Sequence, residues 1–313
     1  MFNTYIFCDW NARNALGPAQ PAADNVWVGE ATPQDGLLNE EYFTGRHLAV
    51  EHVTERLLHH VDLGHRILIG FDFAYGYPRG LAAALNLPHD SLTWWAIWTE
   101  LCIRVHDSPQ NDSNRFSAAS DLNHIAGLGG AGPFWGVPPN QATAYLLPNG
   151  PGFPFAAQND IELIRLRITE ERLRGVQEAW KLYGAGSVGS QTLVGIPYVW
   201  RLRRHPKLAR LSRVWPFETS FTPTPCSDLT PCILHAEIWP GVMDNEVDQI
   251  LADDEDAIRD QIQVRVMCQW ASDRDEDGSL GRYFNTPSNL KRNQLDACVS
   301  HEGWILGSPN DEA

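Results

Sequence analysis

The chain has 313 residues, of which 43% are hydrophobic and 20% charged, a composition that excludes a disordered protein and supports a large core. Its 39 acidic residues outnumber its 24 Lys and Arg residues, and the net charge of -15 argues against indiscriminate binding of nucleic acid, which is a polyanion. The chain shows no C-x-x-C pair, no signal peptide and no apolar run near the roughly 20 residues that cross a bilayer. We therefore expect one elaborated domain over residues 1–313, located in the cytoplasm and without a membrane partner.

Five elements are predicted in the N-terminal part of the chain. Strands are expected at 4–8 and 25–29, and a weaker strand at 41–44. Apolar residues then recur at helical spacing over 47–61, which predicts an amphipathic helix, and a last strand follows at 67–71. Because this helix connects them, the first and fourth strands are expected to pair in parallel.

Acidic residues stand where the predicted strands end. Asp9 directly follows the first strand, and Asp72 directly follows the fourth. Glu237 lies inside a further predicted strand at 232–239. In an open α/β sheet, ligands bind in the crevice beyond the carboxyl ends of the strands. Carboxylate oxygens gathered there favour Mg²⁺ or Mn²⁺, which are hard cations.

The long segment at 74–231 is interpreted as an insertion or subdomain, mainly of helices and loops. It contains a predicted helix at 160–183 and a basic stretch at 198–213. After the insertion, the acidic run at 253–256 is suited to the start of a helix whose apolar pattern continues to Trp270. A short strand is expected at 303–306.

This order of strands and helices resembles the RNase H-like fold. Four segments also resemble the signature segments of an uncharacterised bacterial RNase H-like family, some of whose members are labelled as related to molybdenum-cofactor or cobalamin biosynthesis. These segments are FCDWNAR at 7–13, GFDFAYGYP at 70–78, LYGAGSVGSQ at 182–191 and AEIWP at 236–240. The resemblance implies an α/β protein with a mixed sheet flanked by helices, and it covers the chain from residue 4 to about residue 275.

By this resemblance, three residues match the acidic positions of RNase H-like nucleases and resolvases: Asp9, Asp72 and Glu237. Asp260 is the best match for the acid on the last helix. Asp256 lies one turn earlier and Asp273 lies near the helix end, so both remain alternatives for the fourth acid.

The segment GAGSVG at 184–189 matches the spacing of a dinucleotide fingerprint, but its context does not. The residues before it are expected to be helical, and Ser190 stands where a P-loop requires Lys. We favour a helix C-terminal glycine followed by a tight loop over a dinucleotide site. A third reading is an anion nest beside the metal site, to which four residues would contribute: Gly186, Ser187, Gly189 and Ser190.

The basic stretch at 198–213 carries six Lys or Arg residues in an acidic chain. Two readings stay open, a phosphate-facing surface and a solvated amphipathic segment. In the first, Arg201 and Arg204 are the candidates for bidentate phosphate contacts.

These patterns lead to the hypothesis of a metal-dependent phosphoester hydrolase or nuclease-like enzyme. In it, Asp9 bridges one or two Mg²⁺ or Mn²⁺ ions, Asp72 and Glu237 complete the coordination, and Asp260 orients the second ion. The charge of -15 favours a short nucleic acid, a nucleotide or a phosphorylated cofactor as substrate. The alternative is a non-catalytic module that binds a nucleotide-like cofactor or a partner protein in the same crevice.

Overall fold

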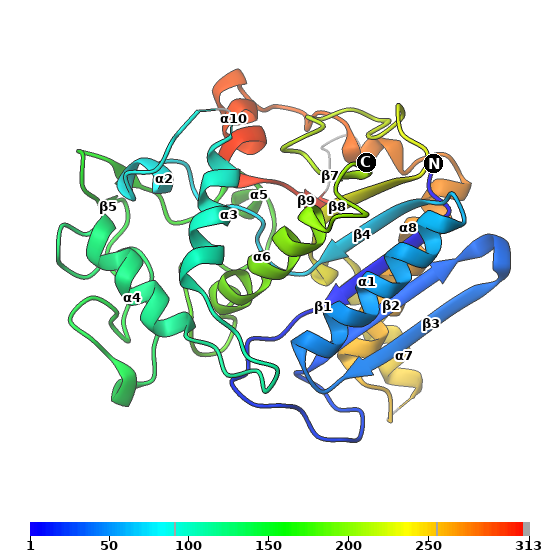
Figure 1. Cartoon of the computed structure of the whole chain (residues 1–313), viewed down its shortest axis with the longest axis horizontal. Helices are drawn as coiled ribbons and strands as arrows, with labels where there is room; N and C mark the ends of the chain where they lie inside the picture. Colours follow the sequence, from blue (N-terminus) through cyan, green and yellow to red (C-terminus); the bar gives the residue numbers. More distant parts are fainter. Residues whose placement is uncertain (91, 255, 309–313) are drawn as a thin grey trace.

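The computed structural model describes residues 1–90, 92–254 and 256–308. The protein is mixed α/β, with a seven-stranded mixed sheet flanked by helices on both faces (Figure 1). The strand order is β3-β2-β1-β4-β8-β7, and β9 also pairs with β8. None of the helices in the described ranges has both the length and the apolar character needed to span a membrane.

The N-terminal elements follow the expected order. They are β1 (Thr4–Asp9), β2 (Val26–Thr32), β3 (Leu37–Phe43), α1 (Arg46–Asp62) and β4 (Arg66–Phe71). The strands next to one another in sequence form an antiparallel meander, whereas β1 and β4 pair in parallel, as the connecting helix predicted. The third strand is longer than its sequence pattern indicated.

The C-terminal elements complete the sheet and cover it. The strand β8 (Cys232–Ile238) pairs in parallel with β4, and both β7 (Ser212–Val214) and β9 (Ile305–Leu306) pair in parallel with β8. The helices α7 (Asp244–Asp253) and α8 (Arg259–Glu276) follow β8. The expected strands at 232–239 and 303–306 are confirmed, with slightly different ends.

The segment between β4 and β8 carries most of the remaining elements. These are α2 (Leu81–Ala84), α3 (Thr93–Arg104), α4 (Arg115–Ala126), η2 (Pro139–Gln141), β5 (Phe155–Ala156), β6 (Glu162–Leu163), α5 (Ile168–Arg172) and α6 (Gly189–Arg204). Short turns and helices elsewhere are η1 (Pro33–Asp35), η3 (Pro240–Met243), α9 (Gly281–Phe284), α10 (Arg292–Ala297) and η4 (Cys298–Glu302). In Figure 1, α2 and α4 lie beyond the edge of the main sheet, and α6 runs back across it.

The prediction of a helix at 160–183 is wrong. Only α5 is helical there, and Gly175 adopts a φ of 90°, a left-handed conformation that an α-helix does not contain. Trp180 is nevertheless fully buried. Tertiary burial of an irregular segment therefore produced apolar spacing that resembled a helix. The long helix of this region, α6, begins only at Gly189, the last residue of the glycine segment.

The start of the last helix also differs from the expectation. Asp253 ends α7, and α8 begins at Arg259, so Asp256 lies between the two helices and not on the face of α8 that carries Asp260. The other part of the acidic run, residue 255, falls outside the described residues.

Two hydrophobic clusters occupy the two faces of the sheet. Because strand side chains alternate between faces, Ile6 and Cys8 of β1 pack in the cluster beneath α1 and α6, whereas Tyr5 and Phe7 pack with α8. The same alternation decides toward which face each acidic residue at a strand end points.

Candidate active site

Asp9 and Asp72 are neighbours at the carboxyl edge of the sheet. Asp9 is the last residue of β1, and Asp72 directly follows β4. Cys8 pairs with Phe71 across the two strands, and the N–H of Asp72 donates to the backbone oxygen of Cys8 at 3.3 Å. The parallel register therefore brings together two acids that are 63 positions apart in the chain, as the sequence predicted.

A cleft of about 810 Å³ opens at this edge. Four acidic residues line it: Asp9, Asp24, Asp72 and Asp260. Groups that could bind an anion also line the cleft, namely the segment at 184–187, Ser190 and Arg115. Acids and potential anion-binding groups thus share a single cavity.

The carboxylates of this cleft repel one another. Burial raises the pKa of Asp9 well above its usual range, and the charges of Asp72, Asp260 and Asp24 raise it further. Burial also raises the pKa of Asp72 to about 8, although the N–H of Trp10 donates to its Oδ1 at 2.7 Å and favours the charged form. Within the described residues, neither Asp9 nor Asp72 forms an ion pair with Lys or Arg. A cation placed beside them would stabilise both as carboxylates.

Asp260 is the acid of α8 that the structure brings to this cleft. It lies in the first turn of the helix, and its Oδ2 accepts the N–H of Asp24 at 2.6 Å. Burial raises the pKa of Asp260 as well. The alternative Asp273 lies 13 residues further along α8, about 20 Å away along the axis, and lines a different groove.

Glu237 is not part of this carboxylate group. Glu237 pairs with Phe71 of β4 and lies four residues after Ile233 on β8. Because side chains of a strand alternate between the two faces, Glu237 points to the same face as Ile233, the one covered by α1 and α6. There it is 2% exposed and forms a bidentate ion pair with Arg167, at 2.6 Å to Nη2 and 2.7 Å to Nη1. The N–H of Tyr75 also donates to its Oε2 at 2.9 Å. Its oxygens are therefore already occupied by donors of the protein.

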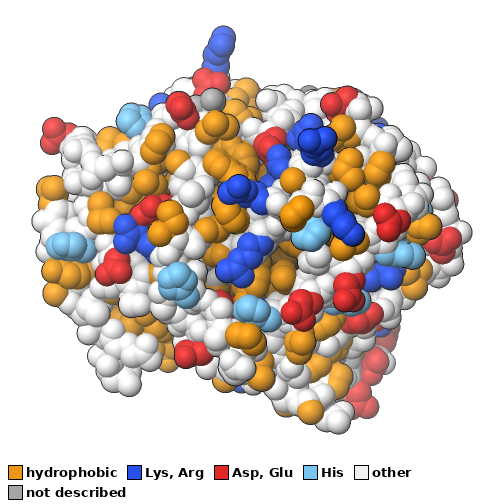
Figure 2. Space-filling model, viewed as in Figure 1, with side chains coloured by type: hydrophobic (Ala, Val, Ile, Leu, Met, Phe, Trp, Pro, Cys, Tyr) orange, Lys and Arg blue, Asp and Glu red, His pale blue; other side chains and the backbone are white. Residues whose placement is uncertain are grey.

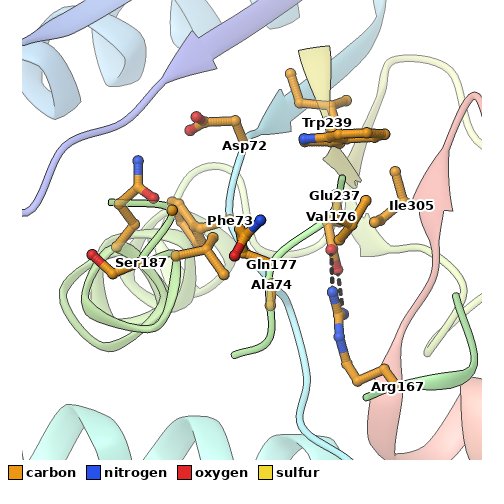
Figure 3. Close-up of a pocket in the computed structure, with 14 residues that line it drawn as sticks. Asp72, Phe73, Ala74, Arg167, Val176, Gln177, Ser187, Glu237, Trp239 and Ile305 are labelled. Atoms are coloured by element: carbon orange, nitrogen blue, oxygen red, sulfur yellow. Dashed lines mark hydrogen bonds and ion pairs between the residues drawn. The ribbon is translucent and has the colours of Figure 1, made fainter. Parts of the chain in front are cut away.

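The ion pair of Glu237 forms one wall of a second, smaller pocket of about 290 Å³ (Figure 3). In the figure, Asp72 and Trp239 lie above this ion pair, and Ser187 approaches from the side of the glycine segment. Asp72 and Ser187 line both cavities, so the two adjoin each other. Trp239 places an indole ring at the edge of the smaller pocket, a feature that the sequence argument did not use.

The glycine segment leads into a helix and does not end one. Gly184 and Gly186 have φ values of 95° and 67°, and Gly189 is the first residue of α6. A Cβ at Gly189 would lie 2.4 Å from the backbone oxygen of Ala179, so only glycine fits this start. The favoured helix C-terminal reading is thus wrong. The segment also does not follow a strand, as a dinucleotide fingerprint requires.

Arg201 and Arg204 lie in the last turn of α6, away from the cleft. Their guanidinium groups lie over aromatic rings, 5.4 Å from the centre of Tyr198 and 4.6 Å from that of Trp200. Figure 2 shows Lys and Arg side chains gathered near the middle of the face that α6 crosses. The helix start, about 18 Å away along the axis, is the end that faces the acids.

The donor set fits a cation that needs few protein ligands. In the described ranges, no three His, Cys, Asp or Glu side chains converge as a ready-made metal site. Mg²⁺, however, is commonly held by one or two carboxylates together with waters and substrate phosphates. The carboxyl groups of Asp9 and Asp72, which form no ion pair with any described residue, line a cavity with room for a ligand and match that pattern.

Comparisons with protein-family models, with curated proteins and with solved structures gave no match for this chain. The functional argument therefore depends on the geometry and charge of the cleft.

Proposed function

We propose that this protein is a divalent-metal-dependent phosphoester hydrolase of RNase H-like architecture. Two observations support the architecture: the antiparallel meander β1–β3, and the parallel addition of β4 and β8 beside β1. The observation that carries the function is the pair Asp9 and Asp72, which repel each other in a cleft that also holds the start of α6.

In this proposal, Asp9 and Asp72 hold Mg²⁺ or Mn²⁺. The bound ion would supply an activated water and stabilise the leaving oxygen of the ester. Asp260 adds negative charge at the same edge and holds the segment at Asp24 in place through its hydrogen bond. The roles of Asp9 and Asp72 as metal ligands follow the sequence hypothesis, whereas Asp260 no longer orients a second ion. Glu237, paired with Arg167, would form a wall of the smaller pocket in place of a metal ligand.

Calorimetry with Mn²⁺ tests the proposal directly. The wild type should bind with micromolar to millimolar affinity, and Asp9→Ala should abolish binding because it removes one of two available carboxylates. Asp121→Asn, an exposed acid on α4, is the matched control and should bind as the wild type does. The rate of hydrolysis of bis(p-nitrophenyl) phosphate with Mn²⁺ should likewise be equal in the wild type and Asp121→Asn and be lost in Asp9→Ala. Undiminished Mn²⁺ affinity and hydrolysis in Asp9→Ala would overturn the proposal.

A non-catalytic binding module is the second candidate, and one observation favours it. Glu237 is neutralised by Arg167, so the cleft has fewer free carboxylates than the sequence hypothesis required. This candidate predicts that a nucleotide is retained without turnover. Tight binding of a nucleotide such as AMP or ATP, with no product formed in the presence of Mn²⁺, would favour it over the hydrolase.

A further inference from the structure

Arg115 is the first residue of α4 and forms part of the cleft wall. Its side chain is held on two sides: Nε donates to Ser190 Oγ at 3.0 Å, and Nη1 donates to Ser113 Oγ at 3.1 Å and to the side-chain oxygen of Asn14. The third nitrogen, Nη2, donates no hydrogen bond within the described part of the chain. The guanidinium is therefore fixed in direction, with one end still available.

Arg115 differs from the other buried arginines that the structure describes. Arg46 is paired with Asp107 through two contacts of 2.6 and 2.7 Å, and Arg167 is paired with Glu237 and Glu170. Arg115 is 9% exposed, yet no carboxylate among the described residues lies within ion-pair distance of it. A buried charge without a counter-ion is costly, so this position is expected to be completed by an anion.

Burial and the charge of nearby Arg46 together lower the pKa of Arg115 to about 10, although the charge of Asp107 acts in the opposite direction. The guanidinium still carries its charge at neutral pH. Arg115 can therefore attract an anion over the pH range in which phosphate is a dianion or monoanion.

The start of α6 lies next to Arg115 and lines the same cleft. The N–H groups of Ser190 and Gln191 make no hydrogen bond with any described residue, as expected for the first turn of a helix. The hydroxyl of Ser187 is likewise without a partner in the described ranges. Unpaired amides and the positive end of the helix dipole favour an anion at this place. The direct contact of Arg115 with Ser190 joins the two features into one site.

We propose that Arg115, Ser187 and the first N–H groups of α6 form a phosphate subsite on the wall of the cleft that faces Asp9 and Asp72. This inference rests on the proposed function for the identity of the anion as the phosphate of a substrate. Arg115 Nη2 and the two amides donate to phosphate oxygens, while the acids of the opposite wall hold the cation. Phosphate binding at Arg201 and Arg204 is not needed.

The size of the cleft identifies the class of substrate. The cavities of about 810 and 290 Å³ adjoin each other and have the volumes of small-molecule sites. With the phosphate beside Arg115, the rest of the ligand extends past Asp72 and Ser187 toward the indole of Trp239 (Figure 3). We therefore expect a small phosphate ester with a planar group, of the size of a mononucleotide, to fit this site better than a nucleic-acid polymer.

Titration with inorganic phosphate in EDTA, followed by ³¹P NMR, tests the subsite without any metal. The wild type should bind, and Arg115→Gln should weaken binding at least tenfold. Arg115→Lys should weaken it less, about threefold, because it keeps the charge but not the planar fork. Arg210→Gln, which changes an exposed arginine outside the cleft, is the matched control and should leave the affinity unchanged.

Ser187→Asp tests the same subsite without altering a buried residue. It places a negative charge beside the unpaired amides of α6, so phosphate binding should disappear while the circular dichroism spectrum stays native.

The outcomes separate the subsite from the hydrolase proposal. Phosphate affinity that is unchanged in both Arg115→Gln and Ser187→Asp overturns the subsite, whatever the metal experiment shows. If both variants lose phosphate binding but the wild type binds no Mn²⁺, the subsite stands and the hydrolase proposal fails.

For substrate size, AMP should bind more tightly than inorganic phosphate, and Trp239→Ala should remove that advantage. Tighter binding of a ten-nucleotide single strand than of AMP would overturn the inference on size.

Discussion

Two groups of buried charge lie within neighbouring strands of the same sheet and behave in opposite ways. Around Arg167, every charge has a partner: Glu237 and Glu170 bind its guanidinium, and Nη1 also donates to the backbone oxygen of Glu302 at 2.8 Å. Asp9 and Asp72 form no ion pair with any described residue, and burial and repulsion raise both pKa values. The first group is neutralised within the protein, whereas the two acids of the second form no ion pair with any described residue.

The largest expected effect comes from breaking the neutralised group. Arg167→Met leaves Glu237 and Glu170 buried without a cation, which should lower the free energy of unfolding by about 3–5 kcal/mol. Urea denaturation at pH 7 measures this change. A loss below about 1 kcal/mol would show that the network contributes little to stability and would remove the contrast between the two groups.

Two buried arginines provide a sharper version of the same comparison. Arg46→Met leaves Asp107, whose side chain is 5% exposed, without its ion pair and should lower the free energy of unfolding by about 3 kcal/mol. Arg115→Met removes a charge that has no carboxylate partner, so it should change stability by less than about 1 kcal/mol or increase it. Equal destabilisation of the two variants would contradict the view that Arg115 awaits an external anion.

The group of Asp9 and Asp72 should show itself in the pH dependence of stability. The pKa of Asp72 is raised to about 8 in the folded protein, so the folded state binds its proton more tightly than the unfolded state does. Its contribution to stability is therefore greatest near pH 4 and is lost as the pH rises through about 8. Asp72→Asn cannot lose a proton, so at pH 9 without metal its free energy of unfolding should exceed that of the wild type by about 2 kcal/mol. Solvent in the cleft offsets part of the cost of burying the ionised Asp72 and keeps the difference this small.

Thermal and urea unfolding of wild type and Asp72→Asn between pH 4 and 9 measure this difference. Asp121→Asn serves as the control for the loss of one exposed charge, and its free energy of unfolding should depend on pH as that of the wild type does. A constant difference between wild type and Asp72→Asn over the whole range would contradict the raised pKa.

The smallest effect is expected at the far end of α6. Arg201→Gln removes a guanidinium that lies over Tyr198 and away from the cleft. Phosphate affinity in EDTA should therefore stay within about twofold of the wild type. A loss as large as that of Arg115→Gln would restore the basic stretch at 198–213 as the phosphate surface.

Local sequence patterns predicted the central strands and the acidic part of the candidate site formed by Asp9 and Asp72. The apolar runs before Asp9 and Asp72 indicate buried strands, and the helix between them favours parallel pairing, so the meeting of these acids at one edge follows from short-range rules. Asp260 was reached through the resemblance to the RNase H-like fold. The same patterns failed at 160–183, where an irregular segment buries Trp180 and imitates a helix.

The sequence by itself determined that acids stand at the ends of central strands, because strand period and burial are properties of neighbouring residues. Only the tertiary structure decided which charges are neutralised. Glu237 meets Arg167 across 70 positions, and Arg115 meets Ser190 across 75, and no local rule encodes such contacts. The alternation of side chains on β8 then turns Glu237 away from Asp9, because a shift of one residue moves a side chain to the other face of the sheet.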